Sequence, residues 1–176
     1  MSEGFPLIFR VACRVGGVSP VVGGRMPNRA SRHLRKERAM RFMIMVKANA
    51  ASESGAMPDA SLIAAMAAYH EELAKAGVLL DAAGLQPSSK GWRVRYSGGK
   101  RAVVDGPFAE TKELIAGYTL IQVRSRDEAL EWTRRFPAPF GEHDGGEIEV
   151  RQLFELDDFE PGDGVDRFRE LESKLG

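Results

Sequence analysis

Two side chains of this chain could carry acid–base chemistry, Asp105 and His70. Asp105 ends an apolar segment and stands before a Gly-Pro turn, in the stretch VDGPFAETKE. His70 flanks an apolar helical stripe, and imidazole is the natural proton carrier near neutral pH. The two side chains predict proton transfer on a small organic molecule, with Asp105 as the base and His70 assisting.

The surroundings of Asp105 support that role but leave an alternative. Gly98 and Gly99 supply the positive φ angles of a two-residue hairpin turn, which makes Trp92 the cross-strand partner of Asp105. A carboxylate on the apolar face of such a hairpin must find hydrogen-bond donors or take up a proton, and either outcome suits a base or a ligand anchor. The alternative is that Asp105 only accepts backbone N–H bonds in the following turn.

Four further side chains are candidates for ligand binding. Trp92, Tyr96 and Tyr118 could line an aromatic pocket for a small cyclic ligand, although aromatic residues on strands are more often part of the core. Lys112 could neutralise an anionic ligand or simply pair with its acidic neighbours. The acidic loop around His143 predicts no metal site, because consecutive residues rarely converge on one ion, and we expect no cofactor.

Alternating and helical periods predict the elements that position these residues. Strands are expected at 41–47, 78–80, 117–123 and 147–154, and a hairpin at 91–106. One amphipathic helix is expected from Pro58, at its first position, to Gly77. A capping box at Ser125 begins a second helix, and a third, short amphipathic helix ends the chain.

This order of elements predicts an α+β fold, a ferredoxin-like antiparallel sheet with two helices on one face. The strand at 41–47 carries Phe42, Ile44 and Val46 on one face and Met43 and Met45 on the other. A sheet face left bare would expose a large apolar patch, so we expect a homodimer formed through that face.

Composition excludes several classes of function. The 176 residues are 43% hydrophobic and 28% charged, as in a soluble globular protein, and no apolar run is long enough to span a bilayer. The single Cys13 offers neither a disulfide nor a cysteine zinc site. No nucleotide-binding, zinc-protease or serine-hydrolase motif is present. We expect a cytoplasmic protein without a membrane partner.

Residues 1–39 differ from the rest and are predicted to be a disordered basic extension. Residues 1–40 contain eight Lys or Arg and two Asp or Glu, a balance of +6 that the remainder offsets with −6. Nucleic-acid binding is disfavoured because no aromatic residues are interleaved with these basic ones. Another hypothesis is that natural translation starts at Met40, since the preceding codons can encode a purine-rich ribosome-binding sequence.

Several strings resemble one known family. AGVLLDAAGLQPSS (76–89), VVDGPFAETKELIAGYTLI (103–121), the SRDEALEWTRRFP helix and EIEVRQLFE (147–155) are similar to the YCII-related, or DGPF-domain, proteins of bacteria. The resemblance covers roughly Met40 to the C-terminus. The predicted organisation is a YCII-related domain at 40–158, followed by a C-terminal amphipathic helix at 159–176.

The resemblance implies a dimeric α/β barrel in which two sheets enclose pockets. It also implies a proposed His-Asp active site in related proteins, of which one removes chloride from a chlorinated hydroxyhydroquinone. Members of this family often occur beside extracytoplasmic-function sigma factors. We therefore expect a dimeric small-molecule-binding protein or cofactor-independent enzyme that uses Asp105. The alternative is a non-catalytic accessory module linked to sigma-factor signalling.

Overall fold

The computed structural model describes residues 39–141 and 145–175 of the chain. The predictions for the N-terminal extension fall on residues outside this part, apart from Ala39. The strands are β1 (Met40–Lys47), β2 (Leu79–Gly84), β3 (Trp92–Ser97), β4 (Lys100–Asp105), β5 (Ile115–Val123) and β6 (Ile148–Gln152). The helices are α1 (Ala50–Glu53), α2 (Ala60–Lys75), α3 (Arg126–Arg134) and α4 (Asp163–Leu175). Short 3-10 helices are η1 (Ser88–Lys90), η2 (Thr111–Glu113) and η3 (Leu156–Asp158).

Four strands form one antiparallel sheet in the order β2-β5-β1-β6. Strand β5 pairs with β1 on one side and β2 on the other, so β1 and β2 run in the same direction and α2 connects them. The α+β prediction with an antiparallel sheet is confirmed, and the strand order is consistent with a ferredoxin-like arrangement.

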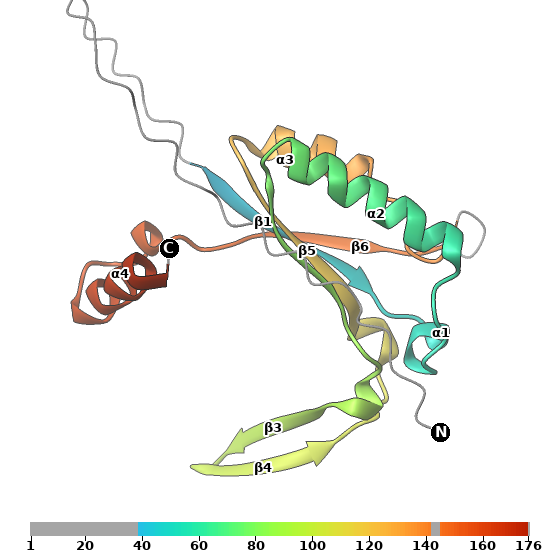
Figure 1. The fold of residues 1–176 in the computed structure, drawn as a ribbon. Helices are drawn as coiled ribbons and strands as arrows, with labels where there is room; N and C mark the ends of the chain where they lie inside the picture. The colour runs from blue at the N-terminus through green and yellow to red at the C-terminus, as the bar shows by residue number, and fades with distance from the viewer. Residues whose placement is uncertain (1–38, 142–144, 176) are drawn as a thin grey trace, which may run out of the picture.

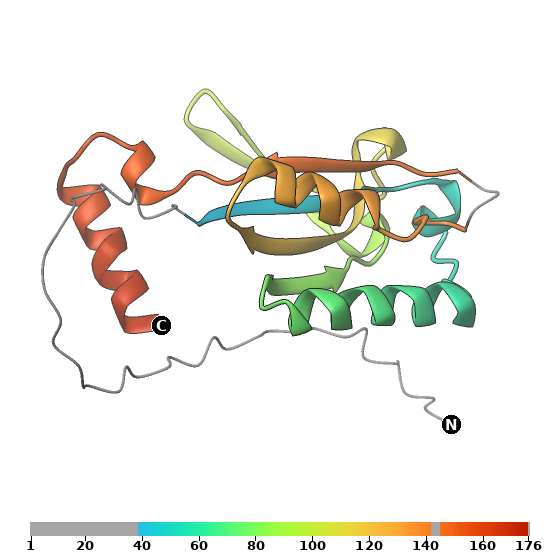
Figure 2. The same cartoon turned by 90° about the horizontal axis from the view of Figure 1, so that it is seen from above.

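The core lies between this sheet and the helices α2 and α3, which lie over the same sheet face (Figures 1 and 2). Alternation along each strand decides which side chains take part, because every second residue faces the helices. As predicted, Phe42 and Ile44 are buried on that face, whereas Met43 and Met45 lie on the other. The helices contribute Tyr69, Leu73 and Ala129 to the core.

Local signals set the helix ends, with one correction to the expected start of α2. Asp59 is the N-cap and its carboxylate accepts the amide of Leu62, so the helix begins at Ala60 and Pro58 lies before it. At the other end, Gly77 adopts a φ of 71°. This left-handed backbone conformation commonly ends an α-helix and favours glycine. Ser125 caps α3 as predicted, accepting the amide of Glu128.

The hairpin β3–β4 forms a separate two-stranded sheet. It projects from the four-stranded sheet on the side opposite to α2 and α3 (Figure 1). Helix α4 lies beyond the end of β6, beside η3, with Phe168 and Leu171 exposed (Figure 1). Within residues 39–141 and 145–175, no helix combines the length and apolar character needed to cross a membrane.

Candidate functional site

The hairpin register matches the prediction from the glycine turn. Trp92 pairs with Asp105, Val94 with Val103 and Ser97 with Lys100, and Gly98 and Gly99 have φ angles of 54° and 75°. Asp105 is exposed, and its carboxylate has no hydrogen bond or ion pair with any described residue. The side chain of Asp105 therefore does not tie down the turn that follows it.

The side chains that share the Asp105 face of the hairpin are exposed. Trp92 is 66% exposed, Tyr96 71% and Val103 67%. Arg101, the cross-strand partner of Tyr96, lies with its guanidinium 5.4 Å from the centre of the Tyr96 ring. We call Trp92, Val94, Tyr96, Val103 and Asp105 the apolar face of the hairpin. Two of the predicted ligand-binding residues, Trp92 and Tyr96, thus lie together with Asp105 on one open surface.

Backbone packing, rather than the aspartate, fixes the DGPF turn. A Cβ atom on Gly106 would lie 1.9 Å from the carbonyl oxygen of Ser88, so only glycine fits there. The Phe108 amide donates to Ser88 Oγ at 3.1 Å. The Ser88 amide and hydroxyl both donate to the Glu53 carboxylate. The GLQPS string (84–88) and the DGPF string (105–108) therefore meet at Ser88.

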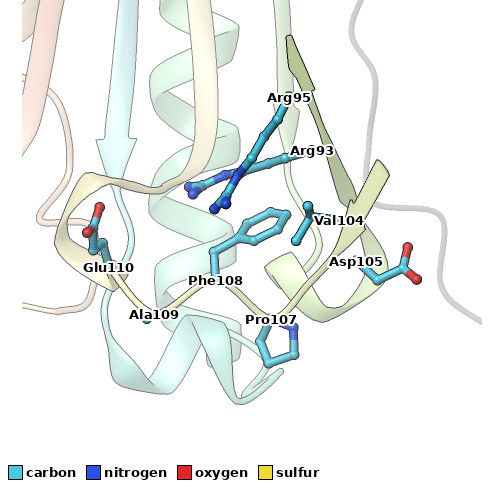
Figure 3. A pocket seen from close by; sticks show the side chains of 8 residues that line it. All are labelled: Arg93, Arg95, Val104, Asp105, Pro107, Phe108, Ala109 and Glu110. Carbon is cyan, nitrogen blue, oxygen red and sulfur yellow. The ribbon is translucent and has the colours of Figure 1, made fainter. Parts of the chain in front are cut away.

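A small cavity lies on the opposite face of the hairpin, at its base (Figure 3). Its volume is about 270 Å³, and Arg93, Arg95, Phe108 and Glu110 are among its lining residues. The Arg93 guanidinium lies 4.0 Å from the centre of the Phe108 ring, a cation–π contact. Asp105 also borders the cavity, but its carboxylate points away from the arginine guanidinium groups (Figure 3).

His70 lies between α2 and the sheet, away from the hairpin. Its Nδ1 is 2.8 Å from the Met66 carbonyl oxygen and its Nε2 is 2.9 Å from Thr119 Oγ1. Burial lowers the pKa of His70, and the bond to Met66 opposes this shift. A carbonyl only accepts, so Nδ1 carries the proton and the neutral ring accepts the Thr119 hydroxyl through Nε2. The structure brings His70 together with Thr119 and not with Asp105.

Tyr118 lies on the sheet face opposite to the helices, where its hydroxyl donates to Asp81 of β2 at 2.8 Å. The predicted aromatic pocket thus divides between two places, the hairpin and the sheet. The side chain of Lys112 and the loop residue His143 lie outside the described residues. In the part of the chain that the structure describes, no three His, Cys, Asp or Glu side chains converge as metal ligands would.

Sequence reasoning overlooked three features of the structure around these residues. The alternation of Arg93 and Arg95 was visible, but the Phe108 wall that turns them into a cavity depends on the fold of the DGPF turn. The contact of Glu53 with Ser88 spans 35 residues and carries no sequence period. Asp81 within the apolar run VLLDAAG was the available signal for the Tyr118 contact.

Comparisons with known proteins give a family and one relative. A family model described as the YCII-related domain matches residues 40–157. An uncharacterised protein of Rhizobium meliloti (strain 1021) is 42% identical over 69 residues, which cover 39% of this chain and 56% of that protein. The match therefore spans little more than half of the relative's length.

Proposed function

The chain belongs to the YCII-related family, and from this membership we propose that it is a homodimer that binds a small organic molecule at the apolar face of the hairpin. In this proposal Asp105 accepts a proton or a hydrogen bond from the bound molecule. A second copy of the chain, meeting the sheet face opposite to the helices, closes the site. No cofactor takes part.

The exposure of the apolar face carries this proposal. Trp92 and Tyr96 are each about two thirds exposed or more on a hairpin that stands away from the core. Clustered large apolar side chains in water mark ligand or partner contacts. Trp92 is the direct cross-strand neighbour of Asp105, so a ring that stacks on Trp92 has its polar substituent within reach of the carboxylate.

The ligand that fits this arrangement is an aromatic molecule with a weakly acidic hydroxyl group. Its ring would contact Trp92, and its hydroxyl would donate to Asp105. A charge-assisted hydrogen bond of this kind is strong where water is excluded, and a covering partner chain would exclude it. His70 is not assigned a role, because both of its ring nitrogens already bond within the fold.

Titration of the full chain with hydroquinone and resorcinol tests the proposal through quenching of Trp92 fluorescence. A Trp132→Phe background leaves Trp92 as the one tryptophan, since the chain has two. We expect saturable quenching. Asp105→Asn should weaken the affinity for the phenol about ten-fold or more, because the charged acceptor is lost. The control is Asp127→Asn, which removes an exposed carboxylate from the first turn of α3.

Two results would overturn this function: the absence of saturable quenching, or the same affinity in the Asp105→Asn variant. Chromatography of the bound phenol after incubation separates the two forms of the proposal. Conversion that Asp105→Asn abolishes supports the enzyme. Binding without conversion supports the non-catalytic accessory module, for which a sigma factor is the partner to seek.

A further inference from the structure

We propose a second binding site on the opposite face of the hairpin, where Arg93 and Arg95 hold a small anion bearing a carboxylate or a phosphate group. The site is the cavity of about 270 Å³ beside Phe108. It does not depend on the function proposed for Asp105. That residue borders the cavity, but its carboxylate points away from the two arginines, which lie on the other hairpin face and supply the contacts of this site (Figure 3).

The strand geometry brings the two arginines to one side. Arg93 and Arg95 are two residues apart on β3, so both side chains leave the same face, roughly 7 Å apart at their Cα atoms. Figure 3 shows both guanidinium groups extending past Phe108, while Asp105 points the other way. Two planar cations on one side of a cavity match the oxygens of a carboxylate or phosphate.

Neither arginine is neutralised within the described residues. Other arginines of the chain have carboxylate partners, among them Arg41 with Glu155 at 2.8 Å and Arg169 with Asp157 at 3.1 Å. Arg93 and Arg95 form no ion pair in the described part, although Arg93 is half-buried. A partly desolvated guanidinium without a counter-charge gains more from an incoming anion than one fully in water.

The wall of the cavity that contacts Arg93 is held in place before any ligand arrives. Phe108 lies under the Arg93 guanidinium, and its amide is bonded to Ser88, which Glu53 holds in turn. This chain of contacts restricts the rotamers of Arg93. Less conformational entropy is therefore lost when an anion binds.

The volume of the cavity and its remaining charge limit the ligand. At about 30 Å³ per water molecule the cavity holds the equivalent of about nine, which suits a phosphate or a short carboxylic acid and is below the usual size for drug-like ligands. Glu110 lines the same cavity on the side away from Asp105 (Figure 3). Its carboxylate opposes an anion, so it lowers the affinity that the two arginines provide.

Chemical-shift titration of the ¹⁵N-labelled full chain with inorganic phosphate, and separately with acetate, tests this site at low ionic strength. We expect saturable shifts in the amides of residues 93–95 and 108–110. Replacing both arginines, Arg93→Gln with Arg95→Gln, is expected to weaken binding about ten-fold or more. Glu110→Gln is expected to strengthen it, because the opposing charge is removed.

Arg101→Gln is the matched control, because Arg101 lies on the same hairpin but on its apolar face. It removes a positive charge from the hairpin without touching the cavity, so binding should change less than two-fold. Equal weakening by Arg101→Gln and by a single Arg95→Gln would show only general charge attraction and would overturn the site. The absence of saturable shifts would do the same. Core amide shifts report whether each variant is folded, and Arg93→Lys, which keeps the charge, should bind more tightly than Arg93→Gln.

Discussion

His70 shows how the fold can use a histidine without placing it in a pocket. One ring nitrogen bonds to the carbonyl of Met66, four residues earlier on the same helix. The other bonds to the buried Thr119 of β5. Thr119 is the one polar residue among the fully buried side chains of the described core, and His70 satisfies its hydroxyl. We therefore assign His70 a structural contact, and its proposed assistance in proton transfer stays a prediction.

This contact predicts a pH-dependent stability. Burial lowers the pKa of folded His70 below the ordinary value of 6.5, so the unfolded chain binds more protons as the pH falls below 6.5. The contribution of His70 to the free energy of unfolding is therefore at its maximum above pH 6.5. It decreases as the pH falls towards the pKa of the folded state. Urea unfolding at pH 7.5 and pH 5.0 should show a larger loss for the wild type than for His70→Gln. Equal losses in the two proteins would contradict the assignment.

Asp105 and Gly106 are adjacent, yet only one of them was predictable. The position of Asp105 followed from the Gly98-Gly99 turn, because a two-residue turn fixes every pair of the hairpin. The need for Gly106 comes from the Ser88 carbonyl, which approaches from a segment 18 residues earlier. The pattern of residues along a sequence predicts the register of a hairpin. It does not predict which distant segments approach each other closely.

At the scale of elements, the hairpin β3–β4 depends on its base for its position. Its strands pair only with each other in the described part, and the Gly106 amide bonds to the Gly91 carbonyl at 3.0 Å. Beyond this, Ser88 connects the DGPF turn to α1 through Phe108 and Glu53. Helix α1 and η1 were not predicted, because three or four residues are too few to show a period.

Ser88→Ala should therefore loosen the hairpin base. The change leaves the Phe108 amide without its acceptor and takes one donor from the Glu53 carboxylate, at a cost of about 1–3 kcal/mol. Hydrogen exchange of the Phe108 amide should accelerate accordingly. The adjacent Ser89→Ala is the control, because Ser89 is exposed. In this variant the Phe108 amide should exchange as fast as it does in the wild type. Equal protection of Phe108 in the two variants would show that Ser88 does not hold the turn.

The whole molecule is two-sided. Helices α2 and α3 cover one face of the four-stranded sheet (Figure 2). On the other face lie Met43, Met45, Tyr118 and Leu120, all half-buried, and the hairpin projects on that side. The two-faced pattern of β1 predicted from the sequence that this second face carries apolar side chains, whereas it did not predict the projecting hairpin. The structure describes a single chain, so a dimer formed through this second face stays a proposal.

Leu120→Lys tests the proposed dimer. Leu120 lies on the helix-free face beside its cross-strand partner Asp81, so lysine adds charge there without placing two carboxylates together. In a two-fold dimer formed through this face, the new charges would be buried or brought close to each other, and both effects oppose association. Leu130→Lys makes the same substitution at an exposed position of α3, on the other side of the sheet, and serves as the control. Sedimentation velocity at micromolar concentration should find dimers for the wild type and the control, and folded monomers for Leu120→Lys. A wild-type monomer, or a Leu120→Lys dimer, would exclude this face as the interface and leave the apolar face of the hairpin without its proposed cover.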